Sequence, residues 1–220
     1  MLSVVPTPIG NLEDITLRAL RVLKDCDIIL CEDTRRTKIL LEKYNIKKQL
    51  ISCHSYNQKK RVELLIELLK NNKNVVYVTD SGTPCISDPG WELVSKAIEN
   101  NFCVECLPGP TAFVPALVCS GLPTDGFVFL GFLPRKKSKI KKLLTSVSSI
   151  KKTIIFYESP HRIKRTIELC KSIFKPETKL VIARELTKKF EEFIRGTIET
   201  VYNEILKREE IKGEIVVLLY

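Results

Sequence analysis

Short apolar runs alternate with segments of helical periodicity through the first half of the chain. Strands are predicted at residues 2–5, 27–30, 49–52, 75–78 and 102–106, and the apolar run 75–78 predicts a buried one. The segments between them predict helices at residues 15–24, 37–44, 59–70 and 89–99. The clearest is 59–70, where Val62, Leu65, Ile66 and Leu69 fall on one helical face. Strand–helix alternation at this spacing indicates a mainly parallel sheet covered on both faces.

The pattern changes after residue 111. A helix is expected at 112–120, followed by strands at 127–131, 153–157, 179–184, 193–197 and 214–219. Further helices are expected at 136–147, 160–174 and 198–208. The strands on either side of Glu191 lie close together in sequence, which predicts a hairpin and therefore a mixed sheet. The fold class is α/β in two lobes, residues 1–111 with a mainly parallel sheet and residues 112–220 with a mixed one.

Three loops that follow strands have the composition of a ligand site. Parallel α/β sheets bind ligands where their strands end, and glycine lets a ligand approach the backbone closely. The Asp88-Pro89 pair after the second of these loops predicts a helix start, with Asp88 as the N-cap. The residues that we assign to the ligand are Thr7, Pro8, Gly10, Asp80, Ser81, Gly82, Thr83, Pro84, Pro108, Gly109, Pro110, Thr111 and Ala112.

The same loops argue against a nucleotide phosphate. Neither a GxGxxG sequence nor a glycine-rich loop ending in lysine occurs in the chain. Prolines in the loop after the first strand also remove backbone donors that a pyrophosphate needs. S-adenosylmethionine fits better, because loop backbone and small polar side chains can hold its adenosine, sulfonium and amino-acid parts.

Composition narrows the class of protein further. No apolar run approaches the roughly 18 residues of a membrane span, and the first residues lack the pattern of a signal peptide. The eight cysteines lie in apolar segments, so we expect buried thiols and a cytoplasmic protein. The one CxxC, Cys103 to Cys106, lies on a predicted strand, where its sulfurs point to opposite faces. We expect no metal site and no membrane contact.

The net charge of +10 is concentrated in one segment. Residues 135–152 contain eight basic and no acidic residues. Such a cluster is typical of phosphate binding, and the competing interpretation is a solvated helix face. We predict that this segment positions an RNA backbone, through Arg135, Lys136, Lys137, Lys141 and Lys142.

Eight segments, in order along nearly the whole chain, carry a family resemblance. They begin at Pro6, Cys31, His54, Thr79, Leu107, Tyr157, Ala183 and Lys212, and read PTPIGNLED, CEDTR, HSYNQ, TDSGTP, LPGPTA, YESPHR, ARELTK and KGE. The chain resembles the tetrapyrrole-methylase superfamily and, within it, the bacterial small-subunit ribosomal RNA 2′-O-methyltransferase I family. The resemblance implies a homodimer with S-adenosylmethionine in a cleft between two α/β lobes. It implies methylation of a cytidine ribose near the decoding centre, on small-subunit ribosomal RNA or the assembled subunit.

Candidate reactive residues follow from this chemistry, because a ribose hydroxyl is a poor nucleophile and needs a base or a stabilising cation. Glu32, Asp33 and Arg35 follow the second predicted strand, although an N-cap acid with surface arginines explains them equally well. Glu185 and Lys188 end a later strand and offer a lysine–carboxylate pair; a surface ion pair is the alternative.

Three more residues are assigned to RNA. Arg36 lies beside the first candidates, and His161 and Arg162 are expected in the first turn of the helix that begins at Pro160, where a phosphate can bind. Trp91 is expected to pack inside. Two other functions remain open: methylation of a tetrapyrrole or other small molecule, and non-catalytic RNA binding. Measured binding of S-adenosylmethionine separates the second of these from an enzyme.

Overall fold

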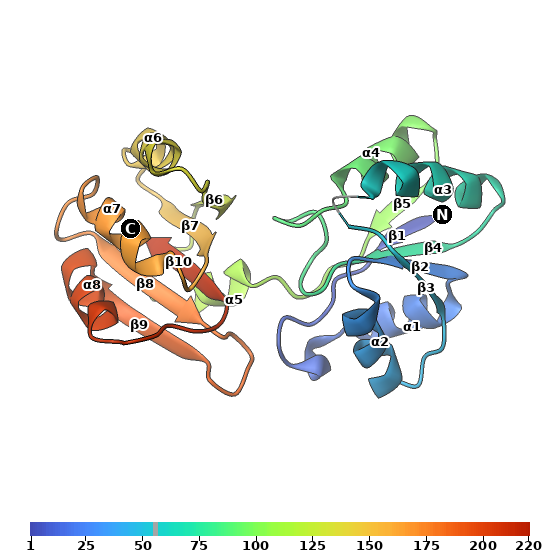
Figure 1. The fold of residues 1–220 in the computed structure, drawn as a ribbon, viewed down its shortest axis with the longest axis horizontal. Helices are drawn as coiled ribbons and strands as arrows, with labels where there is room; N and C mark the ends of the chain where they lie inside the picture. The colour runs from blue at the N-terminus through green and yellow to red at the C-terminus, as the bar shows by residue number, and fades with distance from the viewer. Residues whose placement is uncertain (55–56) are drawn as a thin grey trace. The chain divides into compact units, whose positions relative to one another are not determined.

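The computed structural model describes residues 1–54 and 57–220, which form two compact units, Met1–Thr111 and Ala112–Tyr220 (Figure 1). Ser55 and Tyr56, part of the HSYNQ segment, lie outside the described residues. Each unit has its own five-stranded sheet. In the described part of the chain, no helix is both long enough and apolar enough to cross a membrane.

The N-terminal unit is built on a wholly parallel sheet in the order β3-β2-β4-β1-β5. Its strands are β1 (Leu2–Val4), β2 (Ile28–Cys31), β3 (Gln49–Ser52), β4 (Val75–Val78) and β5 (Val104–Cys106). Its helices are the short 3₁₀ turn η1 (Leu12–Asp14), α1 (Leu17–Asp25), α2 (Thr34–Lys43), α3 (Gln58–Lys70) and α4 (Trp91–Glu99). The predicted parallel sheet is confirmed.

Helices cover both faces of this sheet (Figure 1). Leu23 of α1 and Leu40 of α2 belong to one buried cluster, and Leu65 of α3 and Leu93 of α4 belong to another. Residues of β4 contribute to both clusters, because successive side chains of a strand point to opposite faces. A strand buried on both sides is apolar throughout, which is why β4 is so easily found in the sequence.

The C-terminal unit contains a mixed sheet in the order β6-β7-β10-β8-β9. β6 and β7 are parallel, whereas β10 is antiparallel to both of its neighbours and β8 and β9 form the predicted hairpin. The strands are β6 (Phe127–Phe132), β7 (Thr153–Glu158), β8 (Lys179–Arg184), β9 (Glu192–Thr197) and β10 (Ile215–Leu219). The helices are α5 (Phe113–Val118), α6 (Lys137–Val147), α7 (Ile163–Lys171) and α8 (Ile198–Leu206).

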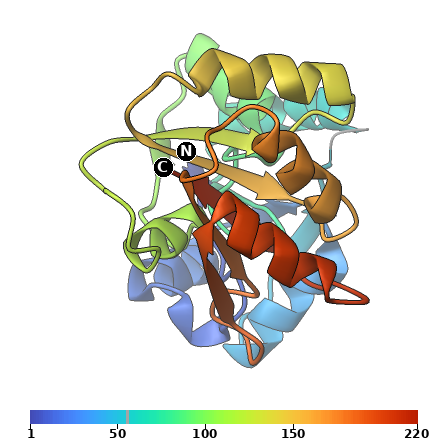
Figure 2. The ribbon, with the colours of Figure 1, turned by 90° about the vertical axis from the view of Figure 1, so that its left-hand side faces the viewer.

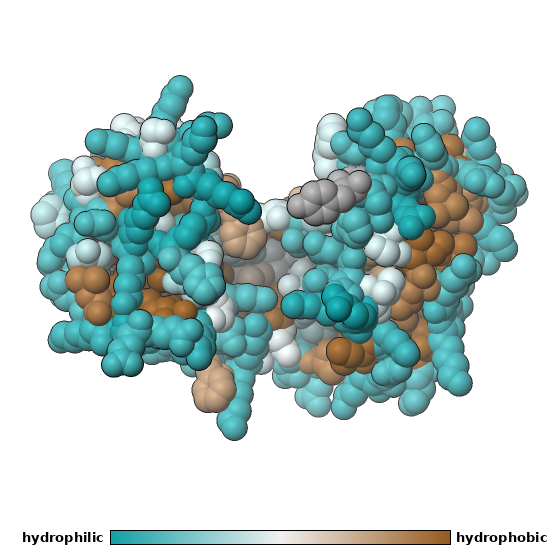
Figure 3. Space-filling view, in the orientation of Figure 1, coloured by the Kyte–Doolittle hydropathy of each residue, from teal (hydrophilic) through white to brown (hydrophobic). Residues whose placement is uncertain are grey.

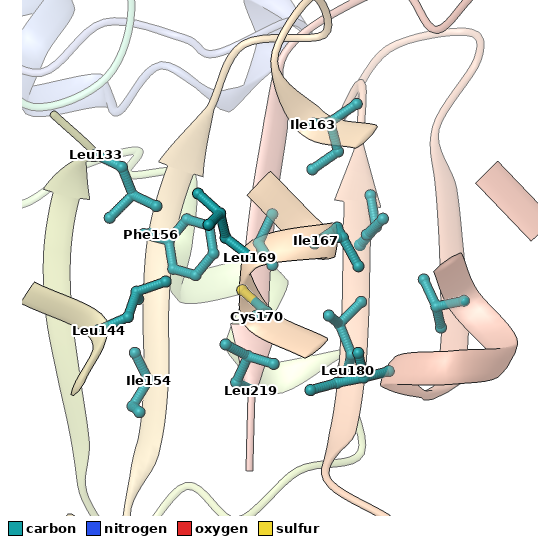
Figure 4. Close-up of a cluster of buried hydrophobic side chains, with 14 of the residues drawn as sticks. Leu133, Leu144, Ile154, Phe156, Ile163, Ile167, Leu169, Cys170, Leu180 and Leu219 are labelled. Atoms are coloured by element: carbon teal, nitrogen blue, oxygen red, sulfur yellow. The ribbon is translucent and has the colours of Figure 1, made fainter. Parts of the chain in front are cut away.

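One face of the C-terminal sheet carries the main core of this unit. α6, α7 and α8 lie in front of the sheet in Figure 2 and pack on that face. Figure 4 shows the labelled side chains of β7, β8 and β10 meeting those of α7; Phe156, Ile167 and Leu180 are examples. The short helix α5 contacts the opposite face, where Phe113 stacks on Phe129 with ring centroids 4.6 Å apart.

A bulge interrupts β6. Phe129 pairs with Ile155 of β7, and Phe132 pairs with Tyr157, so two residues of β6 stand opposite one residue of β7. Gly131, inside the bulge, has φ +63°, a backbone conformation that favours glycine. A bulge of this kind shifts the alternation of side chains by one, and it turns Phe132 toward the face that Phe129 occupies.

The predicted helix start at Asp88-Pro89 is wrong. α4 begins at Trp91, and its N-cap is Gly90, with φ +125° and no side-chain capping bond. A Cβ at Gly90 would overlap the Tyr77 ring, and the Tyr77 hydroxyl donates a hydrogen bond to the Pro89 carbonyl at 2.8 Å. Packing around Tyr77 therefore sets the start of α4, rather than the local Asp-Pro signal.

Three further expectations need correction. Trp91 is 69% exposed rather than packed, because α4 turns other residues, such as Leu93, toward the sheet. α7 begins at Ile163 with Arg162 as its N-cap, so His161 precedes the helix and neither lies in its first turn. Buried thiols hold for only half of the eight free cysteines: Cys103, Cys106 and Cys119 are exposed, and the first two lie on or next to the edge strand β5.

Candidate active site

The carboxyl ends of the parallel strands gather the predicted ligand loops at one edge of the N-terminal sheet. The connections after β1 and β2 pass over one face, through α1 and α2, whereas those after β3 and β4 pass over the other, through α3 and α4. Loops that depart to opposite faces leave a crevice between them. In this sheet the crevice opens beside the end of β4, with β1 and β2 as its neighbours.

The loops after β1 and β4 are joined by their backbones. Thr7 and Gly82 exchange two backbone hydrogen bonds, each of 2.9 Å. The Thr7 hydroxyl also donates to the Thr79 carbonyl at 3.2 Å. Gly82 has φ +78°, and a Cβ built there would meet only Ile9 and Pro110, at ordinary contact distances. Backbone conformation rather than crowding therefore explains this glycine.

The loop after β5 joins the same group. The Thr83 hydroxyl donates to the Pro110 carbonyl at 2.9 Å and lies 2.6 Å from the Thr111 hydroxyl. Gly109 packs on the Pro6 ring, where a Cβ would clash, so its small size serves the contact between loops. The structure thus brings together most of the residues assigned to the ligand. Gly10 is exposed, and Ala112 is the first residue of the C-terminal unit.

A pocket of about 260 Å³ opens at this edge. The Thr79 hydroxyl oxygen is buried there and has no hydrogen-bond partner among the described residues. A buried polar atom without a partner costs free energy, so a group that reaches it gains a hydrogen bond. Sequence reasoning assigned no role to Thr79. The pocket is lined by Thr7, Pro8, Leu12, Arg36, Thr37, Ile39, Leu40, Thr79 and Asp80.

Two carboxyl groups beside the pocket are poorly compensated. Burial raises the pKa of Asp80, and this effect outweighs Arg36, whose Nε lies 3.5 Å from the Asp80 carboxylate. Burial also raises the pKa of Glu32, and the nearby charge of Asp80 adds to the shift. Both shifts disfavour the charged form of the carboxyl group. A cation that binds beside Glu32 and Asp80 would relieve this unfavourable charge.

Asp33 differs from its two acidic neighbours. Its carboxylate caps α2 by accepting the Arg35 backbone N–H at 2.8 Å, and it pairs with the Arg35 guanidinium at 2.7 Å. Hydrogen bonds from Arg35 lower the pKa of Asp33 to about 2. The Asp33 backbone N–H in turn donates to Asp80 at 3.0 Å. The local geometry is that of an N-cap acid with a surface arginine, which is the plainer of the two interpretations offered for these residues.

A second polar cluster lies at the end of β8 in the C-terminal unit. The Glu185 carboxylate accepts from Lys188 Nζ at 2.8 Å and from the Glu214 backbone N–H at 3.0 Å. Lys188 also lies 3.2 Å from the Glu214 carboxylate. A Cβ at Gly213 would overlap the Glu185 side chain, so the glycine makes room for it. The predicted lysine–carboxylate pair therefore exists as a fixed triad with Glu214.

The protonation states of this triad follow from its contacts. The hydrogen bond from Lys188 lowers the pKa of Glu185. Burial acts to lower the pKa of Lys188, but its hydrogen bond to Glu185 and the charge of Glu214 outweigh burial and raise it. Glu185 is therefore a carboxylate and Lys188 an ammonium at neutral pH. Lys188 can donate hydrogen bonds and stabilise negative charge, whereas neither group suits the role of a base.

An arginine network lies next to the triad. The Glu192 carboxylate pairs with Arg208 through bonds of 2.7 and 2.8 Å and with Arg184 at 3.1 Å. Its pKa falls to about 2, chiefly because of the hydrogen bonds from Arg208. Arg184 and Arg208 line a pocket of about 440 Å³ together with Glu185, Phe190, Glu210, Ile211 and Lys212.

The residues assigned to RNA fall into two groups. Those at the start of α6 are exposed, as is the unassigned Lys139 between them, and no ion pair joins any of these side chains to an acid in the described part of the chain: Arg135, Lys136, Lys137, Lys139, Lys141 and Lys142. These six residues are called the α6 cations below. Figure 3 shows hydrophilic side chains over α6. His161 is also exposed.

Arg36 and Arg162 differ from the α6 cations because each pairs with an acid. The Arg36 Nε lies 3.5 Å from the Asp80 carboxylate. Arg162 pairs at 2.6 Å with Glu158, whose side chain is fully buried, and donates to the carbonyls of Leu133 and Pro134, both at 3.2 Å. The Glu158 carboxylate also accepts from the Thr166 hydroxyl at 2.7 Å. Arg162 thus anchors the chain before α6.

Among residues 1–54 and 57–220 there is no group of three or more metal-ligating side chains.

Comparison with known proteins gives consistent matches along the chain. The sequence profile of the tetrapyrrole (corrin/porphyrin) methylases matches residues 1–202. The chain is 50% identical to ribosomal RNA small subunit methyltransferase I of Hydrogenobaculum sp. (strain Y04AAS1), over 99% of this chain and 94% of that protein. The protein of the same name from Thermotoga maritima (strain MSB8) is 45% identical, over 99% and 97%.

Solved structures show the same fold at lower sequence identity. Uroporphyrin-III C-methyltransferase from Thermus thermophilus, in its complex with S-adenyl homocysteine, superposes with a TM-score of 0.68 at 20% identity. The match covers 99% of this chain and 96% of that one. The fold, with one α/β sheet in each of two units, is therefore shared across the length of both chains.

Proposed function

The chain belongs to the tetrapyrrole (corrin/porphyrin) methylase family, in its small-subunit ribosomal RNA methyltransferase I branch, and from this premise we propose its reaction. The protein transfers a methyl group from S-adenosylmethionine to small-subunit ribosomal RNA. The acceptor is the 2′-hydroxyl of a cytidine ribose near the decoding centre, in the cytoplasm. Each part of this proposal draws on a separate feature of the chain.

The residues at the N-terminal strand ends fit S-adenosylmethionine. Glu32 and Asp80 are carboxyl groups short of a cation, and the cofactor carries a sulfonium and an ammonium. The unpartnered Thr79 hydroxyl offers a hydrogen bond. The pocket of about 260 Å³ is smaller than the about 300–1,000 Å³ typical of ligand sites, so it suits one part of the cofactor. The loops held by the Thr7–Gly82 and Thr83–Pro110 bonds would hold the remainder.

When bound, S-adenosylmethionine supplies a methyl group activated by its attachment to a sulfonium. The chain's own task is then to orient the acceptor hydroxyl and to stabilise the negative charge that develops on its oxygen. Lys188 is suited to this because Glu185 and Glu214 keep it charged and hold it in place. Glu185 acts as a positioning residue for Lys188, and Gly213 leaves the space that Glu185 needs.

One observation carries the choice of substrate: the two units leave opposite charges uncompensated. The carboxyl groups beside the N-terminal pocket are not fully compensated by positive charge, which suits a small cation. The α6 cations are exposed and pair with no acid among the described residues, which suits a polyanion. A tetrapyrrole precursor carries its carboxylates around one compact macrocycle, whereas the α6 cations follow one another along residues 135–142. RNA phosphates fit the α6 cations better.

The deciding experiment is mass-spectrometric mapping of ribose methylation on small-subunit RNA, from cells with and without this protein. We expect one cytidine to lose its ribose methyl group when the protein is absent. Purified protein with S-adenosylmethionine should restore it, on free RNA or on assembled subunits, and should do so in excess chelator. Methylation of a uroporphyrin-type substrate, with RNA left unmodified, would contradict the proposal.

We also propose that two copies of the chain act together as a homodimer. The support is the family resemblance and the large apolar side chains that remain exposed on α4, namely Trp91 at 69% and Ile98 at 58%. Sedimentation equilibrium tests this point, because a homodimer must show twice the mass of the 25.1 kDa chain. A monomer at all concentrations would contradict it.

A further inference from the structure

The bulge in β6 places an aromatic side chain where regular alternation would not. Val128 and Leu130 pack toward the core that α6 and α7 cover, and an unbroken strand would send Phe132 the same way. The bulge turns Phe132 to the opposite face instead. There its ring contacts Tyr157 edge to face, with centroids 5.3 Å apart, and 57% of the residue remains exposed.

Exposure of Phe132 is costly in two ways. A large apolar side chain stays in water, and the chain adopts a left-handed conformation at Gly131 to keep it there. Phe129, one step earlier on the same face, shows the alternative. Its ring is partly buried, because it stacks on Phe113 and also contacts Tyr157. Phe132, by contrast, contacts the Tyr157 ring while more than half of the residue stays exposed.

Positive charge begins three residues after Phe132. The α6 cations follow, starting with Arg135, and none of them pairs with an acid among the described residues. The intervening Leu133 and Pro134 are fixed, because Arg162 donates to both of their carbonyls while it pairs with the buried Glu158. An open aromatic ring and a row of unpaired cations are therefore presented on one rigid stretch of chain.

We propose that Phe132 is a base-stacking residue, on which an unpaired base of the RNA substrate lies while the α6 cations hold the adjoining phosphates. The inference rests on the proposed RNA substrate and extends it to how a single-stranded segment is held. Proteins that bind single-stranded nucleic acid combine these two elements, a flat aromatic ring and a positively charged track for the backbone. A purely apolar partner would gain nothing from the neighbouring cations, whereas RNA uses both.

The test compares Phe132→Ala with wild-type protein on two probes, the RNA fragment that wild type methylates and an inorganic polyphosphate that lacks bases. Loss of one stacked base should weaken RNA binding by about 5- to 150-fold. Polyphosphate binding and the slope of log affinity against log salt should stay unchanged, because stacking releases no counterions. Phe132→Trp should retain RNA affinity, and Phe132→Leu, which keeps an apolar side chain without a flat ring, should not.

Phe127→Ala is the matched control, since Phe127 is an exposed aromatic residue at the other end of the same strand, beside Phe113. Melting curves of all variants check that they fold. Equal RNA affinity in Phe132→Ala and wild type would overturn the inference, as would an equal loss in Phe127→Ala. A change of oligomeric state in Phe132→Ala with RNA affinity intact would assign the ring to a second copy of the chain instead. If wild type bound no RNA, both this inference and the proposed substrate would fall.

Discussion

Carboxyl groups lie near strand ends in both units, and the pKa values of two pairs, Glu32 with Asp80 and Glu185 with Glu192, shift in opposite directions. Burial raises the pKa of Glu32 and Asp80 in the N-terminal unit and outweighs the opposing effect of Arg36 on both. Hydrogen bonds from Lys188 and Arg208 lower the pKa of Glu185 and Glu192 in the C-terminal unit. Glu32 and Asp80 therefore lack a cation that fully compensates their charge, whereas Lys188 and Arg208 already compensate Glu185 and Glu192. We therefore propose that the uncompensated carboxyl groups belong to the ligand site and that the compensated ones support the surrounding structure.

The largest effect is expected from Lys188, for which we propose a role in stabilising charge on the acceptor oxygen. Lys188→Met should lower the rate of methyl transfer by about 10²-fold or more, because the developing oxygen charge loses its cation. Affinities for S-adenosylmethionine and RNA should change little. Single-turnover methylation assays measure the rate, and calorimetry measures the affinities. Lys189→Met, at the next position, is the control; an equal loss there, or a normal rate in Lys188→Met, would remove Lys188 from the reaction.

Asp80→Asn is expected to separate ligand binding from stability. Affinity for S-adenosylmethionine should fall about 10- to 100-fold, because a charge-assisted contact is lost. The melting temperature at neutral pH should rise, because the fold disfavours the charge on Asp80 and asparagine can still accept the Asp33 N–H. Asp125→Asn, at an exposed acid, is the control for both measurements. A lower melting temperature with normal affinity would contradict both expectations, and would make Asp80 a stabilising residue rather than a ligand-binding one.

Removal of positive charge from α6 should affect RNA alone. Replacement of Lys136, Lys137, Lys141 and Lys142 by alanine should weaken RNA binding several-fold or more. Each lost phosphate contact should flatten the slope of log affinity against log salt by about one unit. Cofactor affinity should stay the same. Unaltered RNA affinity and slope would leave the α6 cations as a solvated helix face.

The smallest effect concerns Glu192 and the pH dependence of stability. Glu192→Gln should lower the free energy of unfolding at pH 7 by about 1–2 kcal/mol, since Arg184 and Arg208 lose a charged partner that is only partly exposed. The folded-state pKa of Glu192, about 2, lies below the ordinary 4.5. Its stabilisation is therefore complete above pH 4.5 and is lost as pH falls from there toward 2. Urea titrations across this range should show a shallower acid loss in Glu192→Gln, with Glu210→Gln as an exposed control.

The sequence predicted the elements that periodicity and burial determine. Two strands of the N-terminal sheet, 49–52 and 75–78, have the predicted bounds. The second is a wholly apolar run, Val75–Val78, and all four of its residues are buried. Helix starts were harder. The Asp88-Pro89 signal is local, whereas α4 begins at Trp91 because Gly90 packs on Tyr77, a residue thirteen positions away in the chain. Long-range packing of this kind leaves no local signal.

The candidate site shows the same division. Loops at the ends of parallel strands could be assigned from the sequence, because topology alone places them at one edge. The partners of individual side chains could not. Arg162 resembles a phosphate ligand in the sequence, but the structure pairs it with the buried Glu158. Residues 135–152 contain no aromatic residue, so nothing within this basic segment indicated base stacking. The exposure of Phe132, just before it, depends on the bulge in β6, which the sequence pattern did not predict.

The position of β1 in its sheet has a consequence for biosynthesis. β1 lies between β4 and β5, so both of its hydrogen-bonding neighbours are made later, at residues 75–78 and 104–106. During synthesis β1 must therefore wait for both partners until more than half of the N-terminal unit has been made. The Thr7–Gly82 bridge forms no earlier, because Gly82 follows β4. During translation, the loops after β1, β4 and β5 can join one another only when nearly the whole N-terminal unit has emerged.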